Sequence, residues 1–114
     1  MHEFSLAQGL CRQLLQLAGQ HGAKKIITVR VEIGRLSGIV VDSFAFGFEV
    51  LARENPVTRD AVLEITERDP EYRCPDCRHQ APSTAPAAVC PQCSSERVMP
   101  VGGDDLILTQ VEME

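Results

Sequence analysis

The chain of 114 residues contains no tryptophan, one tyrosine and four phenylalanines, so aromatic residues make up only 4% of it. Positive charge is also scarce, because 11 lysines and arginines stand against 16 acidic residues and the net charge is −5. An acidic chain creates no diffuse positive field that attracts a phosphate backbone or an anionic membrane surface. Few aromatics and low positive charge together argue against a nucleic-acid-binding protein.

Long apolar runs are missing as well. No run approaches the roughly 20 residues needed to span a bilayer. The N-terminus lacks a basic region followed by an apolar stretch, the pattern of a signal peptide. Five cysteines occur as two close pairs and the single Cys11, and without a secretion signal this arrangement favours thiolates in a reducing compartment over disulfides. We therefore expect a cytoplasmic protein that does not associate with membranes.

Two amphipathic helices are predicted. Ser5 and Gln8 have the spacing of a capping box, and leucines then recur at helical intervals, which predicts a helix over roughly residues 5–20. Asp42 or Ser43 is expected to cap a second helix, in which phenylalanines recur on one face. The apolar positions are Leu6, Leu10, Leu14 and Leu17 in the first helix, and Phe44, Phe48 and Leu51 in the second.

Three strands are predicted over residues 26–33, 61–68 and 105–113, since β-branched and other apolar residues alternate there with polar ones. Residues 70–103 differ from this pattern, because they hold six of the seven prolines and few large apolar side chains. A segment of that kind needs a crosslink, such as disulfides or a bound metal ion, to fold. We therefore predict an α+β body, residues 1–69 plus 104–114, with two helices packed on a mostly antiparallel three-stranded sheet. Residues 70–103 form an inserted, zinc-ribbon-like lobe.

Two CPxC turns indicate that this crosslink is a bound metal ion. Cys74 and Cys77 form the first, and Cys90 and Cys93 form the second, with 12 residues between the two turns. This spacing lets two knuckles face each other and complete a tetrahedral shell of four thiolates, which suits a structural zinc ion. Such a site is coordinatively closed, whereas a catalytic zinc keeps one position open. The quartet therefore explains folding and not activity.

Other interpretations of these residues were weighed. A rubredoxin-like iron would use the same sulfurs, but Arg78 and Ser94 follow the knuckles where small residues would let backbone amides reach the sulfur. A thioredoxin-like redox pair requires a CPxC at the start of a helix within a strand-helix-strand unit, which neither knuckle satisfies. His79 could donate to a thiolate or replace one as ligand, although a solvent-facing loop histidine is the simpler interpretation. Cys11 lies on the apolar stripe of the first helix and is expected to pack there.

The first residues, Met1, His2 and Glu3, are also candidates for metal binding. The α-amine of Met1, the amide nitrogen of His2 and its imidazole could chelate one ion in adjoining rings. A fourth ligand, for which Glu3 is a candidate, would complete a tetragonal, nitrogen-rich site that suits divalent nickel or copper. The alternative is an ordinary frayed terminus.

The whole pattern resembles the HypA/HybF family of hydrogenase nickel chaperones. The likeness rests on MHEFSLAQGL at the N-terminus, VEIGRLSGI at the end of the first strand, DSFAFGFEVLAR in the second helix, LEI in the second strand, the two CPxC knuckles and LTQVEM in the terminal strand. It implies a protein that is not an enzyme, with nickel as transferred cargo at His2, Glu3 as a helper and the zinc lobe as a structural part. It further implies a HypB-like GTPase and the nickel-iron hydrogenase large-subunit precursor as partners, with urease accessory proteins in some organisms, and a monomer or weak homodimer.

One position departs from this family. Some members carry an acidic residue six positions beyond the glycine that matches Gly34, as an additional nickel ligand, and this chain has Val40 there. Asp42 lies nearby as a substitute, but Asp is also a preferred helix N-cap. Two rival classes are a zinc-ribbon adaptor, in which the lobe is the binding surface, and a small metalloenzyme, for which the sequence shows neither an open zinc site nor a catalytic triad.

Overall fold

The computed structural model describes residues 2–82, 89–90 and 92–114. The chain divides into two compact units. The first comprises Met1–Glu32, Ile39–Thr66 and Ile107–Glu114, and the second comprises Ile33–Gly38 and Glu67–Leu106. The boundaries predicted from the sequence, 1–69 plus 104–114 for the body and 70–103 for the lobe, stay a prediction.

The first unit contains both helices, α1 (His2–Gln20) and α2 (Val41–Ala52). They pack against each other. Gly47 lies at this contact, where an added Cβ would stand 3.5 Å from the Phe4 ring and 3.6 Å from the Ala7 Cβ. These are ordinary van der Waals distances, so Gly47 lies in direct packing contact with the first turns of α1. Leu10 and Leu14 of the predicted apolar stripe are buried, together with Ala7 and Ala18, whereas Leu6 and Leu17 are half-buried.

Both helices begin earlier than the sequence predicts. Since α1 starts at His2, Ser5 lies inside the helix and not at its cap. The N-cap of α2 is Val40, with φ −81° and ψ 104°, and its own side chain makes no capping hydrogen bond. The prediction that Asp42 or Ser43 caps α2 is wrong, and Asp42 lies in the first turn of α2 instead. Local capping rules fail here because the group that binds the α2 N-terminus comes from a distant part of the chain.

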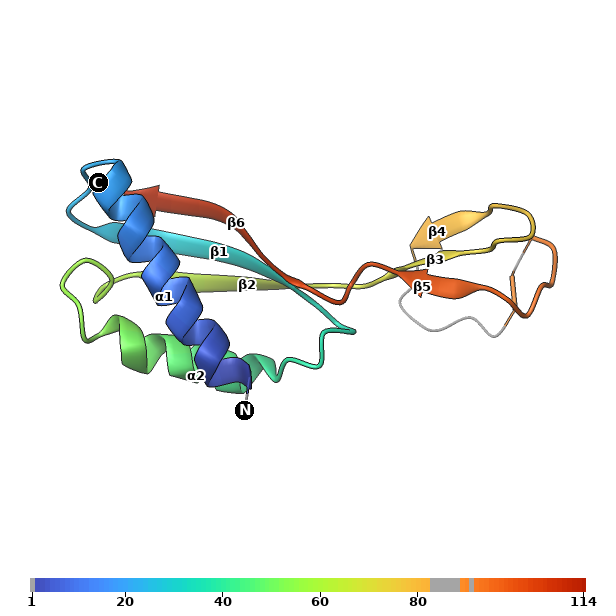
Figure 1. The fold of residues 1–114 in the computed structure, drawn as a ribbon, viewed down its shortest axis with the longest axis horizontal. Helices are drawn as coiled ribbons and strands as arrows, with labels where there is room; N and C mark the ends of the chain where they lie inside the picture. Colours follow the sequence, from blue (N-terminus) through green and yellow to red (C-terminus); the bar gives the residue numbers. More distant parts are fainter. Residues whose placement is uncertain (1, 83–88, 91) are drawn as a thin grey trace. The chain divides into compact units, whose positions relative to one another are not determined.

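The sheet of the first unit has the order β2-β1-β6 (Figure 1). Its strands are β1 (Ile26–Gly34), β2 (Val62–Arg68) and β6 (Leu106–Met113). Beyond the ends of β1 and β6, Lys25 and Glu114 exchange backbone hydrogen bonds, so these two strands run antiparallel. β2 runs in the direction of β1, and the sheet is mixed (Figure 1). The predicted α+β architecture of two helices on a three-stranded sheet is confirmed.

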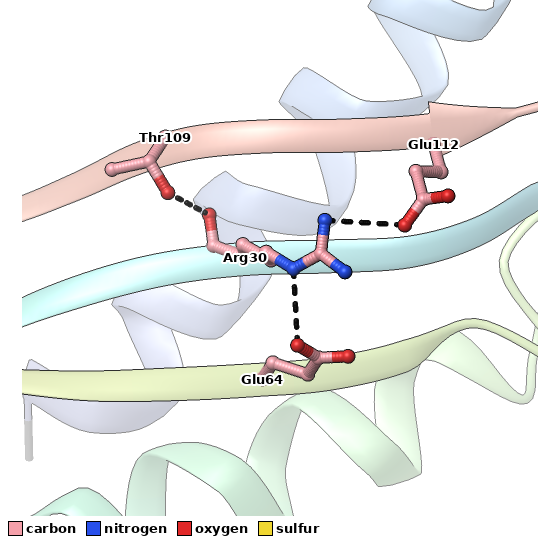
Figure 2. A network of polar contacts seen from close by, with 4 residues as sticks. All are labelled: Arg30, Glu64, Thr109 and Glu112. Atoms are coloured by element: carbon pink, nitrogen blue, oxygen red, sulfur yellow. Dashed lines mark hydrogen bonds and ion pairs between the residues drawn. The ribbon is translucent and has the colours of Figure 1, made fainter.

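The two faces of this sheet differ in polarity. Val29, Val31 and Ile33 are buried on the helical side, together with Phe44 and Phe48 of α2, which are 0% and 2% exposed. Figure 2 shows the opposite side, where polar side chains link all three strands. Arg30 Nε lies 3.0 Å from Glu64 Oε1 of β2, Arg30 Nη1 lies 3.2 Å from Glu112 Oε1 of β6, and Thr109 Oγ1 donates to the Arg30 carbonyl at 3.1 Å.

The second unit has a small sheet of its own, with the order β4-β3-β5. Both pairings are antiparallel, and Tyr72 of β3 stands opposite Ala81 of β4 and Pro100 of β5. The strands are β3 (Glu71–Arg73), β4 (Gln80–Pro82) and β5 (Met99–Val101). Three-residue strands are too short to leave a recognisable alternation in the sequence, so these three were not predicted. No helix in the described part of the chain is long and apolar enough to cross a membrane.

The core of the first unit gives a direct test of stability. Replacing Phe44, which is fully buried, by alanine should lower the free energy of unfolding by about 3–5 kcal/mol, because a ring-sized cavity replaces packed atoms. Phe46→Ala is the matched control on the same helix, since Phe46 is 68% exposed, and it should change the free energy by less than about 0.5 kcal/mol. Urea unfolding followed by circular dichroism measures both, and equal losses would contradict the assigned core.

Candidate metal centres

Four cysteine side chains meet in the second unit. The sulfur atoms of Cys74, Cys77, Cys90 and Cys93 all lie within 4.8 Å of one another. Two separations are 3.6 Å, one from Cys74 to Cys93 and the other from Cys77 to Cys90. All four are free thiols, and the first cysteine of each knuckle is buried while the second is exposed. The two CPxC turns therefore face each other, as their spacing predicts.

The described residues of the two knuckles make the same backbone hydrogen bonds. In the first, the Cys74 N–H donates to the His79 carbonyl at 2.9 Å and the Arg78 N–H donates to the Cys74 carbonyl at 2.9 Å. In the second, Cys90 pairs in the same way with Ser95 and Ser94, at 2.8 Å each. Arg78 and Ser94 both have a φ of 64°, which is uncommon for residues other than glycine. The left-handed residue after each CPxC turns the chain back so that both sulfurs point to one place.

A polar bridge joins the knuckles outside the sulfur cluster. Asp76 of the first knuckle contacts the Ser95 hydroxyl through Oδ2 and the Arg97 guanidinium through Oδ1, the latter at 3.0 Å. The Ser95 hydroxyl also accepts the Arg97 N–H at 3.1 Å. These groups hold the second knuckle against the first. The sequence analysis did not identify them, because no local pattern connects Asp76 with residues 19 and 21 positions later.

The electrostatics of the cluster favour a bound cation. The backbone N–H groups of Cys77 and Asp76 lower the pKa of Cys74 to about 7. The Ser95 N–H acts in the same direction on Cys93, but burial and the neighbouring thiols outweigh it and raise the pKa of Cys93 to about 12. Sulfurs this close therefore cannot all ionise unless a positive charge is shared among them. A divalent metal ion supplies that charge.

The donor set fits a tetrahedral ion. Metal–sulfur bonds of about 2.3 Å in a tetrahedron place the sulfurs about 3.8 Å apart, close to the 3.6 Å found for two of the pairs. Among the described residues, only the four cysteines make up this cluster. His79 contributes its backbone carbonyl to the first knuckle, and its imidazole does not belong to the donor set.

His2 occupies a different kind of position. It is the first residue of α1 and is exposed. The first four N–H groups of an α-helix have no acceptor within the helix, so metal binding by the His2 amide nitrogen breaks no helical hydrogen bond. No cluster of three metal-ligating side chains includes His2 among the residues that the structure describes. The α-amine of Met1, which the sequence predicts as a ligand, lies outside the described residues.

Glu3 is directed toward the second helix. Its Oε2 accepts the Val40 N–H at 3.3 Å, across 37 positions of sequence. This hydrogen bond, together with one from its own backbone N–H, lowers the pKa of the Glu3 carboxyl. The contact gives the α2 N-terminus the acceptor that local residues do not supply, and sequence reasoning missed it.

Cys11 is a residue of α1 in the first unit. It is partly buried, and this burial raises the pKa of its thiol. It is not part of the four-sulfur group.

The fold and site together define a small α+β metal-binding protein with a second unit organised around a four-cysteine metal site. A family model described as "Hydrogenase/urease nickel incorporation, metallochaperone, hypA" matches residues 1–113. The chain belongs to this HypA family, whose members are metallochaperones and not enzymes. It is a nickel metallochaperone of hydrogenase maturation.

Relatives and solved structures agree with this assignment. The chain is 32% identical over 114 residues to the hydrogenase maturation factor HypA of Alkalilimnicola ehrlichii, which covers 100% of both chains. It is 33% identical over 113 residues to the corresponding factor of Paracoccus denitrificans, with 99% of each covered. The solution structure of the Ni metallochaperone HypA from Helicobacter pylori matches with a TM-score of 0.71 at 32% identity, covering 97% of this chain and 96% of that one. A second HypA solution structure matches with a TM-score of 0.79 at 33% identity, covering 100% and 97%.

Removal of one sulfur tests the cluster. Cys74→Ser should abolish stoichiometric binding of a metal ion and loosen the second unit, because the buried sulfur is lost and three thiolates cannot close a tetrahedral shell. Cys11→Ser is the matched control and should keep the metal. Elemental analysis and proteolysis of the second unit measure the two effects. Full metal content and unchanged protease resistance in Cys74→Ser would contradict the site.

Proposed function

We propose that this metallochaperone binds Ni(II) at its N-terminus and delivers it for insertion into nickel-iron hydrogenase, while a structural zinc ion is held by the four cysteines. The observation that carries the proposal is that the chain offers two different kinds of metal donor. The thiols form a compact set without nitrogen donors, whereas His2 is exposed at the beginning of a helix. A cargo ion has to be reached by a partner, and a structural ion does not.

The proposed nickel ligands are the imidazole and amide nitrogen of His2 and the α-amine of Met1. Nitrogen donors in a tetragonal arrangement suit divalent nickel. The imidazole is accessible, and the His2 amide has no helical acceptor. The fourth position would be taken by Glu3, Asp42 or water. Asp42 is available as a candidate because it does not serve as the N-cap of α2.

Zinc is proposed for the cysteines on the chemistry of the donor set. Four thiolates select zinc or an iron centre among common metals, and a closed four-cysteine shell is the usual form of a structural zinc site. When bound, the ion supplies charge neutralisation and folding free energy and has no open coordination position. It would hold the small sheet of the second unit in place.

The proposed partners are a HypB-like GTPase and the hydrogenase large-subunit precursor, with urease accessory proteins as additional partners where urease is present. Support comes from the family description, which names hydrogenase and urease nickel incorporation. The proposed location is the cytoplasm, a compartment in which free thiols remain reduced. We propose a monomer or weak homodimer.

Nickel titration of three forms tests the N-terminal chelate. His2→Ala, and a form extended by a few residues before Met1, should both bind Ni(II) at least about a hundredfold more weakly, since even groups that only support a ligand contribute about 10–100-fold. His21→Ala removes another exposed histidine and should bind like the unchanged protein. A chelator competition assay gives the affinities, and equal binding by all forms would refute the chelate.

The zinc assignment is tested by the metal content of protein purified from medium that contains both zinc and iron. One zinc per chain and no colour from iron are expected, because four thiolates without an open position suit zinc. Stoichiometric iron with a rubredoxin-like absorption spectrum would replace zinc in the proposal.

A further inference from the structure

The contact between Glu3 and Val40 joins the N-termini of the two helices. Glu3 lies in the first turn of α1, and Val40 is the residue before the first turn of α2. The Val40 N–H donates to Glu3 Oε2 at 3.3 Å, while the Val40 carbonyl accepts the Phe44 N–H at 3.0 Å and so begins the helical hydrogen bonds of α2. One residue therefore starts α2 and also binds α1.

The N-terminus of α2 has a need that Glu3 meets. The N–H groups at the start of a helix lack intrahelical acceptors and carry the positive end of the helix dipole. The Val40 side chain offers no capping oxygen, and no side-chain cap is present at this position. A carboxylate from α1 supplies a hydrogen-bond acceptor and a negative charge where both stabilise the helix end.

Packing next to this contact keeps the first turn of α1 close to α2. The Phe4 ring and the Phe4 Cα both lie within 4 Å of the position that a Cβ on Gly47 would occupy. Phe4 is nevertheless 49% exposed, so its apolar contact is incomplete. The Glu3 hydrogen bond adds a polar contact to this packing at a terminus that would otherwise fray.

We propose that Glu3 is a positioning residue, whose carboxylate holds the first turn of α1, and with it His2, against the N-terminus of α2. This role rests on the proposed nickel chelate at His2. A tethered first turn presents the His2 nitrogens in a limited set of orientations, so less conformational entropy is lost when a metal ion binds. Glu3 then raises the nickel affinity without coordinating the nickel ion.

A positioning role and a ligand role require different chemistry from Glu3. Accepting the Val40 N–H needs only a carbonyl-type oxygen, which glutamine also has. Binding nickel as a carboxylate needs the negative charge. Glu3→Gln should therefore bind Ni(II) within about threefold of the unchanged protein, because a neutral hydrogen bond is roughly half as strong as a charge-assisted one. Glu3→Ala should bind about tenfold more weakly, as expected for the loss of a hydrogen bond to a charged group.

The visible absorption of the nickel complex gives a second readout. If Glu3 is not a ligand, the unchanged protein, Glu3→Gln and Glu3→Ala should give the same spectrum at nickel saturation. An equal loss of affinity in Glu3→Gln and Glu3→Ala, together with a shifted spectrum, would show that the carboxylate is a ligand and would overturn the proposal.

Val40 allows the same hydrogen bond to be removed from its other side. Val40→Pro deletes the donated N–H, and the observed φ of −81° lies close to the range that proline adopts. Val40→Ala is the matched control, since it keeps the N–H and changes a side chain that is 56% exposed. Nickel binding should weaken about tenfold in Val40→Pro, as for a lost hydrogen bond to a charged group, and stay within about twofold in Val40→Ala, an ordinary surface change.

The double variant Glu3→Ala with Val40→Pro should bind nickel no more weakly than either single variant, because both substitutions remove the same hydrogen bond. Additive losses, or no difference between Val40→Pro and Val40→Ala, would overturn the proposal. Zinc content and circular dichroism show whether each variant is folded. If Val40→Pro does not fold, the comparison of Glu3→Gln with Glu3→Ala decides.

Hydrogen exchange of the Val40 amide in nickel-free buffer tests the contact independently of the proposed function. Exchange should be about tenfold faster in Glu3→Ala than in the unchanged protein, since loss of the acceptor makes opening easier, and slower in Glu3→Gln than in Glu3→Ala. An identical rate in all three would refute the contact itself. Unchanged nickel binding by His2→Ala would instead refute the chelate, while the exchange rates still report on Glu3.

Discussion

The requirement that four thiol groups share a very small volume governs the second unit. Their sulfurs lie within 4.8 Å of one another. Backbone N–H groups, that of Cys77 above all, lower the pKa of Cys74 to about 7, whereas burial and the neighbouring thiols outweigh the Ser95 N–H and raise the pKa of Cys93 to about 12. Thiolates packed this closely are stable together only around a cation. The strands of this unit are three residues long, too short to form a stable sheet by themselves. Among the described residues of this unit few apolar side chains are buried, so a bound ion would take the place of a hydrophobic core.

The first unit is stabilised differently. Buried Phe44, Phe48 and the apolar side of β1 form a conventional core between helices and sheet, and the buried side of α1 runs from Ala7 to Ala18. The beginning of α1 depends on a polar contact with Val40. A rigid body with a lightly tethered, exposed first turn suits a protein that receives and releases an ion. A closed four-sulfur site would retain its ion.

The sequence predicts features that depend on local spacing. The CPxC turns, the apolar stripe of α1 and the alternation in β1 each repeat over short intervals. The structure places the turns, Leu10 and Leu14 of the stripe and most of the β1 alternation as predicted, whereas Leu6 and Leu17 are half-buried and Ile27 is exposed. Features set by distant residues could not be predicted. The N-cap of α2 is Val40, whose N–H donates to Glu3, 37 positions earlier. Capping rules that consider only neighbouring residues therefore predict Asp42 or Ser43 instead. The bridge from Asp76 to Ser95 and Arg97 likewise appears only after the knuckles fold together. The residues that would bind nickel and zinc remain predictions.

The central claim is that two ions occupy two chemically different sites in one chain. X-ray absorption at the zinc and nickel edges of one sample, loaded with one equivalent of each metal, tests it most directly. The account predicts four sulfur neighbours at about 2.3 Å around zinc, and only nitrogen and oxygen neighbours around nickel. Sulfur in the nickel shell, or nitrogen in the zinc shell, would contradict it.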